Sequence, residues 1–209
     1  MPALVFIYIL IMESTIDITE KKKQFFQRIK DETSDLHRRT EGSRLSVALM
    51  SETLDEKTYG NYLFRMKEIV KYYEENIYPQ LKNVVNDIEE RRKLHLINDD
   101  LSVLQTDLSP RLFTLPPASS TAALLGYMYV LEGSSLGSAM IYKQVSRIIN
   151  ITESRGSAFF TSYGASLSSK WKSFLEMLSE HALEETNARE IIRGARVAFQ
   201  AIGDHLEQY

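Results

Sequence analysis

Cysteine is absent from this chain of 209 residues, which excludes disulfide bonds, thiolate nucleophiles, cysteine-ligated zinc and iron–sulfur clusters. Proline and glycine are scarce, with five and nine residues respectively. These two residue types are the ones that break helices, so their scarcity favours long helices.

The chain also lacks an excess of basic residues, since 25 Lys and Arg stand against 28 Asp and Glu for a formal net charge of −3. This balance argues against a nucleic-acid partner, because binding to phosphates needs a basic face. The content of 44% hydrophobic and 25% charged residues is typical of a soluble globular protein. At about 150 residues per domain, the length predicts a single domain.

The first twelve residues, MPALVFIYILIM, are nearly all apolar. A membrane span needs about 17–25 such residues, so the run predicts no span. It also lacks the positive start and small-residue cleavage site of a signal peptide, and a cytoplasmic location is expected. Two interpretations stay open: Met12 is the true start, or residues 1–18 form an extended arm that adds a β-strand or packs on the core. The remaining residues, 19–209, form the expected helical domain.

Apolar residues recur at helical spacing from Thr19 onward, and no period-2 alternation persists. The pattern predicts an all-α, single-domain multi-helix bundle. The expected helices begin at Thr19 and then cover 55–78 (ended by Pro79), 80–97, 121–149, 157–181 and 187–209, with a mixed loop over 98–120. The helix over 121–149 should be interrupted at GSSLGS.

The first candidate site is a helical stretch in which Thr33, His37 and Glu41 are spaced by four. Together with Lys30, these residues fall within about 100° of one helix face. A carboxylate and a hydroxyl beside His37 can fix its tautomer, as a neutral axial ligand to iron requires. Lys30 would then reach an anionic group at the rim of a flat cofactor. Taken alone, such a histidine is more often a surface residue, and His95, His181 and His205 fit that description.

The second candidate site contains Gly133 and Gly137, four residues apart within a helical pattern. Each glycine costs about 1 kcal/mol relative to alanine, so the pair needs a reason. One reason is a planar ligand lying against the main chain, with Ser134 and Ser138 extending the flat patch. The other is close packing of two helices.

The same stretch spells G-x-S-x-G around Ser135, the signature of a serine hydrolase. That signature requires a strand immediately before the serine, whereas the residues here are helical in pattern. A base at His205 and an acid at Asp204 would point about 100° apart on one helix. The chain has no Glu-x-x-His for a di-iron bundle and no H-E-x-x-H for a zinc protease.

Several segments of the chain, taken in order, resemble the heme oxygenases, most closely the bacterial type found with bacteriophytochromes. The first is the Thr33, His37 and Glu41 spacing with Lys30 upstream, which is similar to the proximal helix of that family. The others are VLEGSSLG at 130–137, FFTSYG at 159–164, KWKSF at 170–174 and AF at 198–199. The resemblance extends from about residue 20 to the C-terminus.

The resemblance implies the helical heme oxygenase fold with a kinked distal helix, and a role for each matching residue. His37 would be the proximal iron ligand, with Thr33 and Glu41 as part of its setting. Lys30 and Lys172 would meet the heme propionates, and Phe199 would form part of the pocket wall. The catalytic distal segment would consist of Gly133, Ser134, Gly137 and Ser138.

The family opens heme, which is both substrate and cofactor, to biliverdin with release of iron and carbon monoxide. It uses dioxygen and an external electron donor, either a reductase or a ferredoxin, and a phytochrome is the implied biliverdin acceptor. The chain departs from the family where Ser138 replaces a second consecutive glycine and Glu176 occupies a position that carries a propionate-binding arginine in some members. Both changes favour the alternative function, a non-catalytic heme- or tetrapyrrole-binding protein on the same fold.

Overall fold

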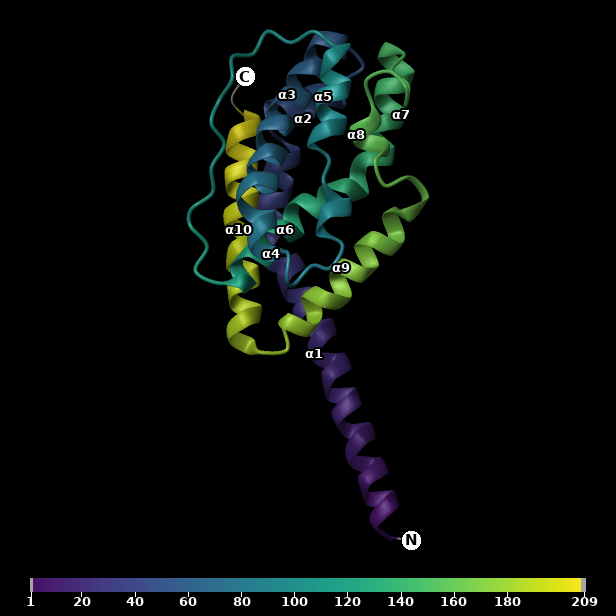
Figure 1. The fold of residues 1–209 in the computed structure, drawn as a ribbon, viewed down its shortest axis with the longest axis vertical. Helices are drawn as coiled ribbons and strands as arrows, with labels where there is room; N and C mark the ends of the chain where they lie inside the picture. The colour runs from purple at the N-terminus through teal and green to yellow at the C-terminus, as the bar shows by residue number, and fades with distance from the viewer. Residues whose placement is uncertain (1, 208–209) are drawn as a thin grey trace.

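The computed structural model describes the backbone of residues 2–207 and the side chains of residues 17–207, and this part of the chain is helical with no β-strand (Figure 1). The α-helices are α1 (Pro2–Glu41), α2 (Arg44–Leu49), α3 (Glu56–Tyr72), α4 (Tyr78–Leu81), α5 (Leu94–Ser102), α6 (Thr121–Ser134), α7 (Ser138–Ile149), α8 (Ala158–Thr161), α9 (Leu167–His181) and α10 (Glu185–Glu207). A π-helix, η1 (Tyr73–Ile77), and three 3₁₀ turns, η2 (Ile88–Arg91), η3 (Ser135–Gly137) and η4 (Gly164–Ser166), join some of them. The prediction of an all-α bundle is confirmed.

The described backbone is helical from Pro2, so the prediction of an extended arm or β-strand there is wrong. Residues 3–41 contain no proline or glycine, so nothing stops the helix from propagating, and a proline is tolerated in the first turn. The N-terminal part of α1 extends away from the other helices (Figure 1). Residue 1 lies outside the described residues. The interpretation of Met12 as the true start stays a prediction. No described helix combines the length and apolar character needed to cross a membrane.

The second expected helix begins as predicted, with the Asp55 side chain accepting a hydrogen bond of 2.7 Å from the Thr58 N–H at its N-cap. Pro79 does not end it, because the π-helical turn η1 lies immediately before the proline and the helix continues to Leu81. A proline in an α-helix clashes with the carbonyl four residues earlier. A wider π turn at that point relieves the clash.

The prediction of one continuous helix over 80–97 is wrong. The chain leaves the helix after Leu81 and re-enters it only at Leu94. The Glu74 carboxylate caps the new helix, accepting hydrogen bonds of 2.6 Å from the Lys93 N–H and 2.8 Å from the Leu94 N–H. Arg91 and Lys93, which lie in the segment between the two helices, are buried.

The most extensive helix–helix contact joins α6 to α10. A Cβ atom built on Gly126 would lie 2.1 Å from the Ile191 carbonyl oxygen, and one on Gly194 would lie 2.3 Å from that of Ala123. The main chains therefore touch, with no room for a methyl group on either side. The long helix expected over 121–149 is interrupted as predicted, because α6 passes through η3 into α7.

We predict that Gly126→Ala lowers the free energy of unfolding by about 1–3 kcal/mol, because the new methyl group would force α6 and α10 apart. Gly137→Ala is the matched control, since a Cβ atom at Gly137 meets nothing within 4 Å. It should leave the free energy of unfolding unchanged or raise it by less than about 1 kcal/mol. Urea denaturation followed by circular dichroism measures both, and equal effects would contradict the assignment of Gly126 to the helix contact.

Candidate functional site

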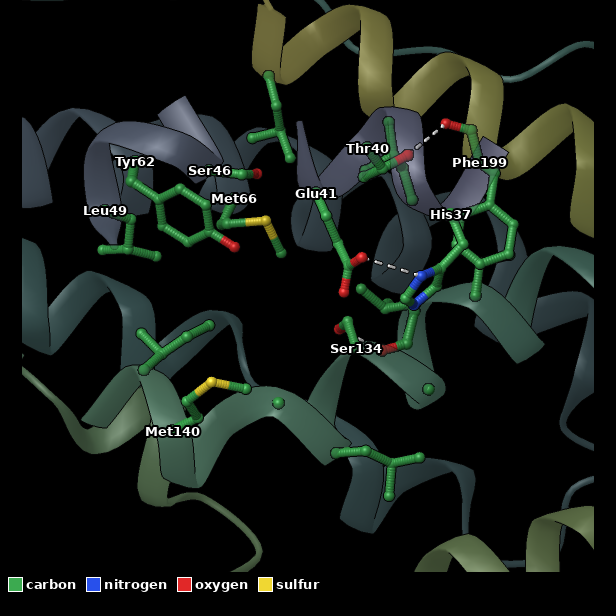
Figure 2. A pocket seen from close by; sticks show the side chains of 18 of the residues that line it. His37, Thr40, Glu41, Ser46, Leu49, Tyr62, Met66, Ser134, Met140 and Phe199 are labelled. Carbon is green, nitrogen blue, oxygen red and sulfur yellow. Dashed lines mark hydrogen bonds and ion pairs between the residues drawn. The ribbon is translucent and has the colours of Figure 1, made fainter. Parts of the chain in front are cut away.

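A cavity of about 670 Å³ opens between the last turn of α1, helices α2 and α3, the α6–α7 segment and α10 (Figure 2). This volume falls within the range of small-molecule binding sites. Most of the side chains that line it are apolar. The lining residues are His37, Thr40, Glu41, Ser46, Leu49, Met50, Tyr62, Met66, Tyr129, Val130, Leu131, Gly133, Ser134, Leu136, Gly137, Met140, Ile141, Trp171, Phe199, Ile202 and Leu206.

His37 lies at one end of this cavity, with its ring between Glu41 and Phe199 (Figure 2). The Nδ1 atom is 3.4 Å from the Glu41 Oε2 atom. The edge-to-face contact with Phe199 has a centroid separation of 5.5 Å and an interplanar angle of 73°. A carboxylate at Nδ1 fixes the proton there and leaves the Nε2 lone pair available to a metal ion. Over the described side chains, no hydrogen bond to Nε2 is present.

Thr33, the hydroxyl expected beside His37, does not line the cavity. Its side chain is buried, and its hydroxyl donates a hydrogen bond of 2.7 Å to the Ile29 carbonyl oxygen. The cavity begins only at the last turn of α1, and Thr33 lies one turn earlier. Thr40 lines the cavity in its place and donates to the carbonyl oxygens of Leu36 (2.9 Å) and Phe199 (3.2 Å).

Gly133 and Gly137 line the same cavity as His37, together with Ser134. A Cβ atom on Gly137 would project into open space, and one on Gly133 would make an ordinary contact of 3.6 Å with Trp171. Close helix packing is therefore the wrong explanation for this glycine pair, although it is the correct one for Gly126. The missing side chains leave bare backbone facing the cavity.

Ser138, expected to extend the flat patch, is buried and does not line the cavity. It follows Gly137 by one residue, and a step of about 100° around the helix turns its side chain away. Ser138 is therefore not positioned to crowd a planar ligand. Ser134 does line the cavity, and its hydroxyl donates 2.6 Å to the Leu131 carbonyl oxygen.

The other end of the cavity is formed by residues that the sequence analysis missed, among them Leu49, Tyr62, Met66 and Met140 (Figure 2). Tyr62 and Met66 are spaced by four on α3, so helical periodicity was the available signal. Burial raises the pKa of Tyr62 to about 12, and its hydroxyl therefore stays neutral.

Neither Lys30 nor Lys172, the two expected propionate partners, lines the cavity. Indeed, the described lining contains no lysine or arginine at all. The Lys172 side chain is 79% exposed, with its Nζ atom 3.8 Å from the Glu176 Oε1 atom. A role for either lysine at the rim of the cavity stays a prediction.

The serine hydrolase alternative is wrong, because its residues are engaged elsewhere. Ser135 is buried and accepts a hydrogen bond of 2.7 Å from the Lys93 Nζ atom. The His205 Nε2 atom lies 2.9 Å from the Glu68 Oε2 atom, and Asp204 pairs with Arg39. The described residues also contain no group of three or more histidine and carboxylate side chains placed to hold a metal ion.

The family model for heme oxygenase matches residues 100–208, just over half of the chain. The heme oxygenase PigA of Pseudomonas aeruginosa is 32% identical over 109 residues, which cover 52% of this chain and 49% of that protein. A heme oxygenase of Xanthomonas campestris pv. campestris is 33% identical over 101 residues, which cover 48% of this chain and 60% of that protein. The chain thus spans about half to three fifths of the length of these curated relatives.

Two solved structures share the fold. The heme oxygenase of Neisseria meningitidis, solved with NO and CO bound, superposes with a TM-score of 0.69 at 22% identity, covering 87% of this chain and 89% of that one. The heme oxygenase of Leptospira interrogans gives a TM-score of 0.71 at 18% identity, covering 88% and 99% respectively. At these identities the likeness establishes the fold.

We predict that Gly137→Leu weakens hemin binding at least about tenfold, because the new side chain enters the cavity where a flat ligand would lie. Ala139→Leu is the control, since it adds a leucine to an exposed position two residues along that does not line the cavity. Titration with hemin, followed by absorption, gives both affinities. Equal affinities in the two variants would show that Gly137 does not face the ligand.

Proposed function

Because the chain belongs to the heme oxygenase family, we propose that it binds heme in the cavity and opens the ring to biliverdin, with release of iron and carbon monoxide. The observation that carries this proposal is the pairing of two surfaces. The His37 ring, with the Glu41 carboxylate 3.4 Å from its Nδ1 atom, lines the same cavity as the bare backbone of Gly133 and Gly137. A flat macrocycle bound in this cavity would meet the His37 nitrogen and a wall that has no side chains at those two positions.

His37 would hold the iron through its neutral Nε2 atom, and Glu41 would keep the ring in that tautomer. The bound heme would supply the iron centre that binds and activates dioxygen. Phe199 packs against the His37 ring and limits its rotation. These contacts set the direction of the metal ligand before heme arrives.

The distal wall would control access to the iron. Without Cβ atoms, Gly133 and Gly137 would leave space on this wall for a small gas molecule, and the space beyond Gly137 is open. Ser134 places a single small hydroxyl on this wall, where it can hold an ordered water molecule. The apolar remainder of the lining would reduce the contact of a bound ring with bulk water.

The reaction requires electrons from outside the chain, and the proposal includes a reductase or a ferredoxin as the external donor. A phytochrome as the acceptor of biliverdin and a cytoplasmic location also remain part of the proposal. The direct test of the reaction is to add hemin and an electron donor in air. Loss of the Soret band with growth of the biliverdin band supports the oxygenase, whereas a stable heme spectrum supports the alternative, a non-catalytic heme- or tetrapyrrole-binding protein.

We predict that His37→Ala abolishes the spectrum of an imidazole-ligated heme and lowers biliverdin formation by about 100-fold or more, because the axial ligand is lost. The fold should survive, since 55% of the His37 side chain is exposed. His95→Ala is the control, at an exposed position on α5 that does not line the cavity. A spectrum unchanged in His37→Ala would reject His37 as the ligand.

We also predict that Lys30→Glu and Lys172→Glu each weaken hemin binding by less than about tenfold, because both lysines are exposed and such ion pairs contribute little. Salt screens exposed charges, and at an ionic strength of about 0.5 M the screening length is about 4 Å. The loss of hemin affinity should therefore shrink as the ionic strength rises to that value. Hemin titrations at low and high salt measure this. A loss that persists at high salt would indicate a direct contact inside the cavity.

A further inference from the structure

A buried polar cluster lies behind the distal wall, on the side of α6 away from the large cavity. Its members are Arg91, Lys93, Glu132, Ser135 and Tyr163, and all but the half-buried Tyr163 are at least nine-tenths buried. The Arg91 guanidinium donates to the Glu132 carboxylate, and the Tyr163 hydroxyl donates to both Glu132 oxygens at 3.0 and 3.1 Å. The function proposed above does not use this cluster.

Lys93 is the member whose hydrogen-bonding capacity is least filled. Its Nζ atom donates to the Ser135 Oγ atom at 2.7 Å and lies 3.7 Å from the centroid of the Tyr163 ring. An ammonium group carries three donor hydrogens, and these two contacts account for two of them. A third donor on a group that is only 8% exposed requires a further acceptor.

A small cavity beside Lys93 supplies the place for that acceptor. Its volume is about 10 Å³, close to that of a single water-sized probe. Arg91, Lys93, Glu132 and Ser134 provide polar groups in its lining, enough to hold one water molecule. Ser134 and Leu131 line both this small cavity and the large one, so the two are separated by little more than the Ser134 side chain.

We propose that the small cavity binds one water molecule, and that Lys93 passes protons through this water and the Ser134 hydroxyl to a ligand in the large cavity. This inference rests on the proposed function, because the reduction of dioxygen there consumes protons, with electrons from the external donor. The Lys93 ammonium gives one proton to the water, which passes one of its own to the Ser134 oxygen. The Ser134 hydroxyl then turns its proton from the Leu131 carbonyl oxygen, its present acceptor, into the large cavity, and the neutral Lys93 amine takes a proton from solvent.

Lys93 is the cluster member suited to giving up a proton near neutral pH. Burial lowers the pKa of Lys93 to about 8, against the opposing charge of Glu132. Burial also disfavours the charge on Arg91, but its hydrogen bonds to Asp87 and the charge of Glu132 raise the pKa of Arg91. Burial, followed by the charge of Glu132, raises the pKa of Tyr163. The groups that face or influence Lys93 are Glu74 on η1, Arg91 on η2, Glu132 on α6, Ser135 on η3 and Tyr163 before η4.

Two substitutions separate proton supply from a structural role. Lys93→Arg keeps the positive charge and a hydrogen-bond donor for Ser135 but holds its proton too tightly to release it. Lys93→Met loses the charge, the donor and the transferable proton. Both variants should form biliverdin about tenfold more slowly or worse, since a positioned proton donor contributes at least that much. Lys143→Arg, at an exposed position on α7, is the control and should keep the wild-type rate.

The pH profile is the second readout. The wild-type rate should fall as the pH rises through about 8, where Lys93 loses its proton, and both variants should lose this dependence. If Lys93→Arg keeps the wild-type rate and profile, Lys93 only holds Ser135 in position and the inference is overturned. The proposed function survives that outcome, whereas a wild-type protein that leaves hemin unchanged would overturn both.

The third readout does not involve heme. A high-resolution crystal structure of the ligand-free protein should show one water molecule within hydrogen-bond distance of the Lys93 Nζ and Ser134 Oγ atoms. A cavity without density would overturn the inference even if turnover is normal. Thermal unfolding of both variants checks that any loss of rate occurs in folded protein.

Discussion

The site depends on the main-chain contact between α6 and α10. Gly126 and Gly194 let the two backbones touch, and each helix then carries one part of the cavity wall. Helix α6 leads into the segment that contains Gly133, and α10 presents Phe199 beside His37. A contact between backbones cannot be adjusted by changing a rotamer, so it fixes the relation between these walls more firmly than side-chain packing would.

The residues that face each other across the cavity could largely be found from the sequence, because their signals are local. His37 and Glu41 are spaced by four on one helix, and the structure places the carboxylate at Nδ1. Gly133 and Gly137 stood out because glycine is costly in a helix. Even there the sequence could not separate a ligand from a neighbouring helix. The open space beyond Gly137 excludes a neighbouring helix at that position.

The remaining features depend on contacts between distant segments, which spacing does not reveal. The expected helix over 80–97 is broken because Glu74 caps α5 and Arg91 turns inward to Glu132. Thr33 matched the spacing as well as Glu41 did, yet the cavity ends one turn short of it. The Lys93–Ser135 hydrogen bond joins residues 42 apart in the chain, so no local pattern indicates it.

The absence of lysine and arginine from the described cavity lining has a consequence for selectivity. Under the proposed function, a ring in the cavity would be recognised by its flatness, its area and the atom that His37 would ligate. The lining offers acidic substituents no lysine or arginine, so they would gain no ion pair within the cavity. Macrocycles of the same outline that differ only in peripheral charge should thus enter with similar ease and differ mainly in how they are seated.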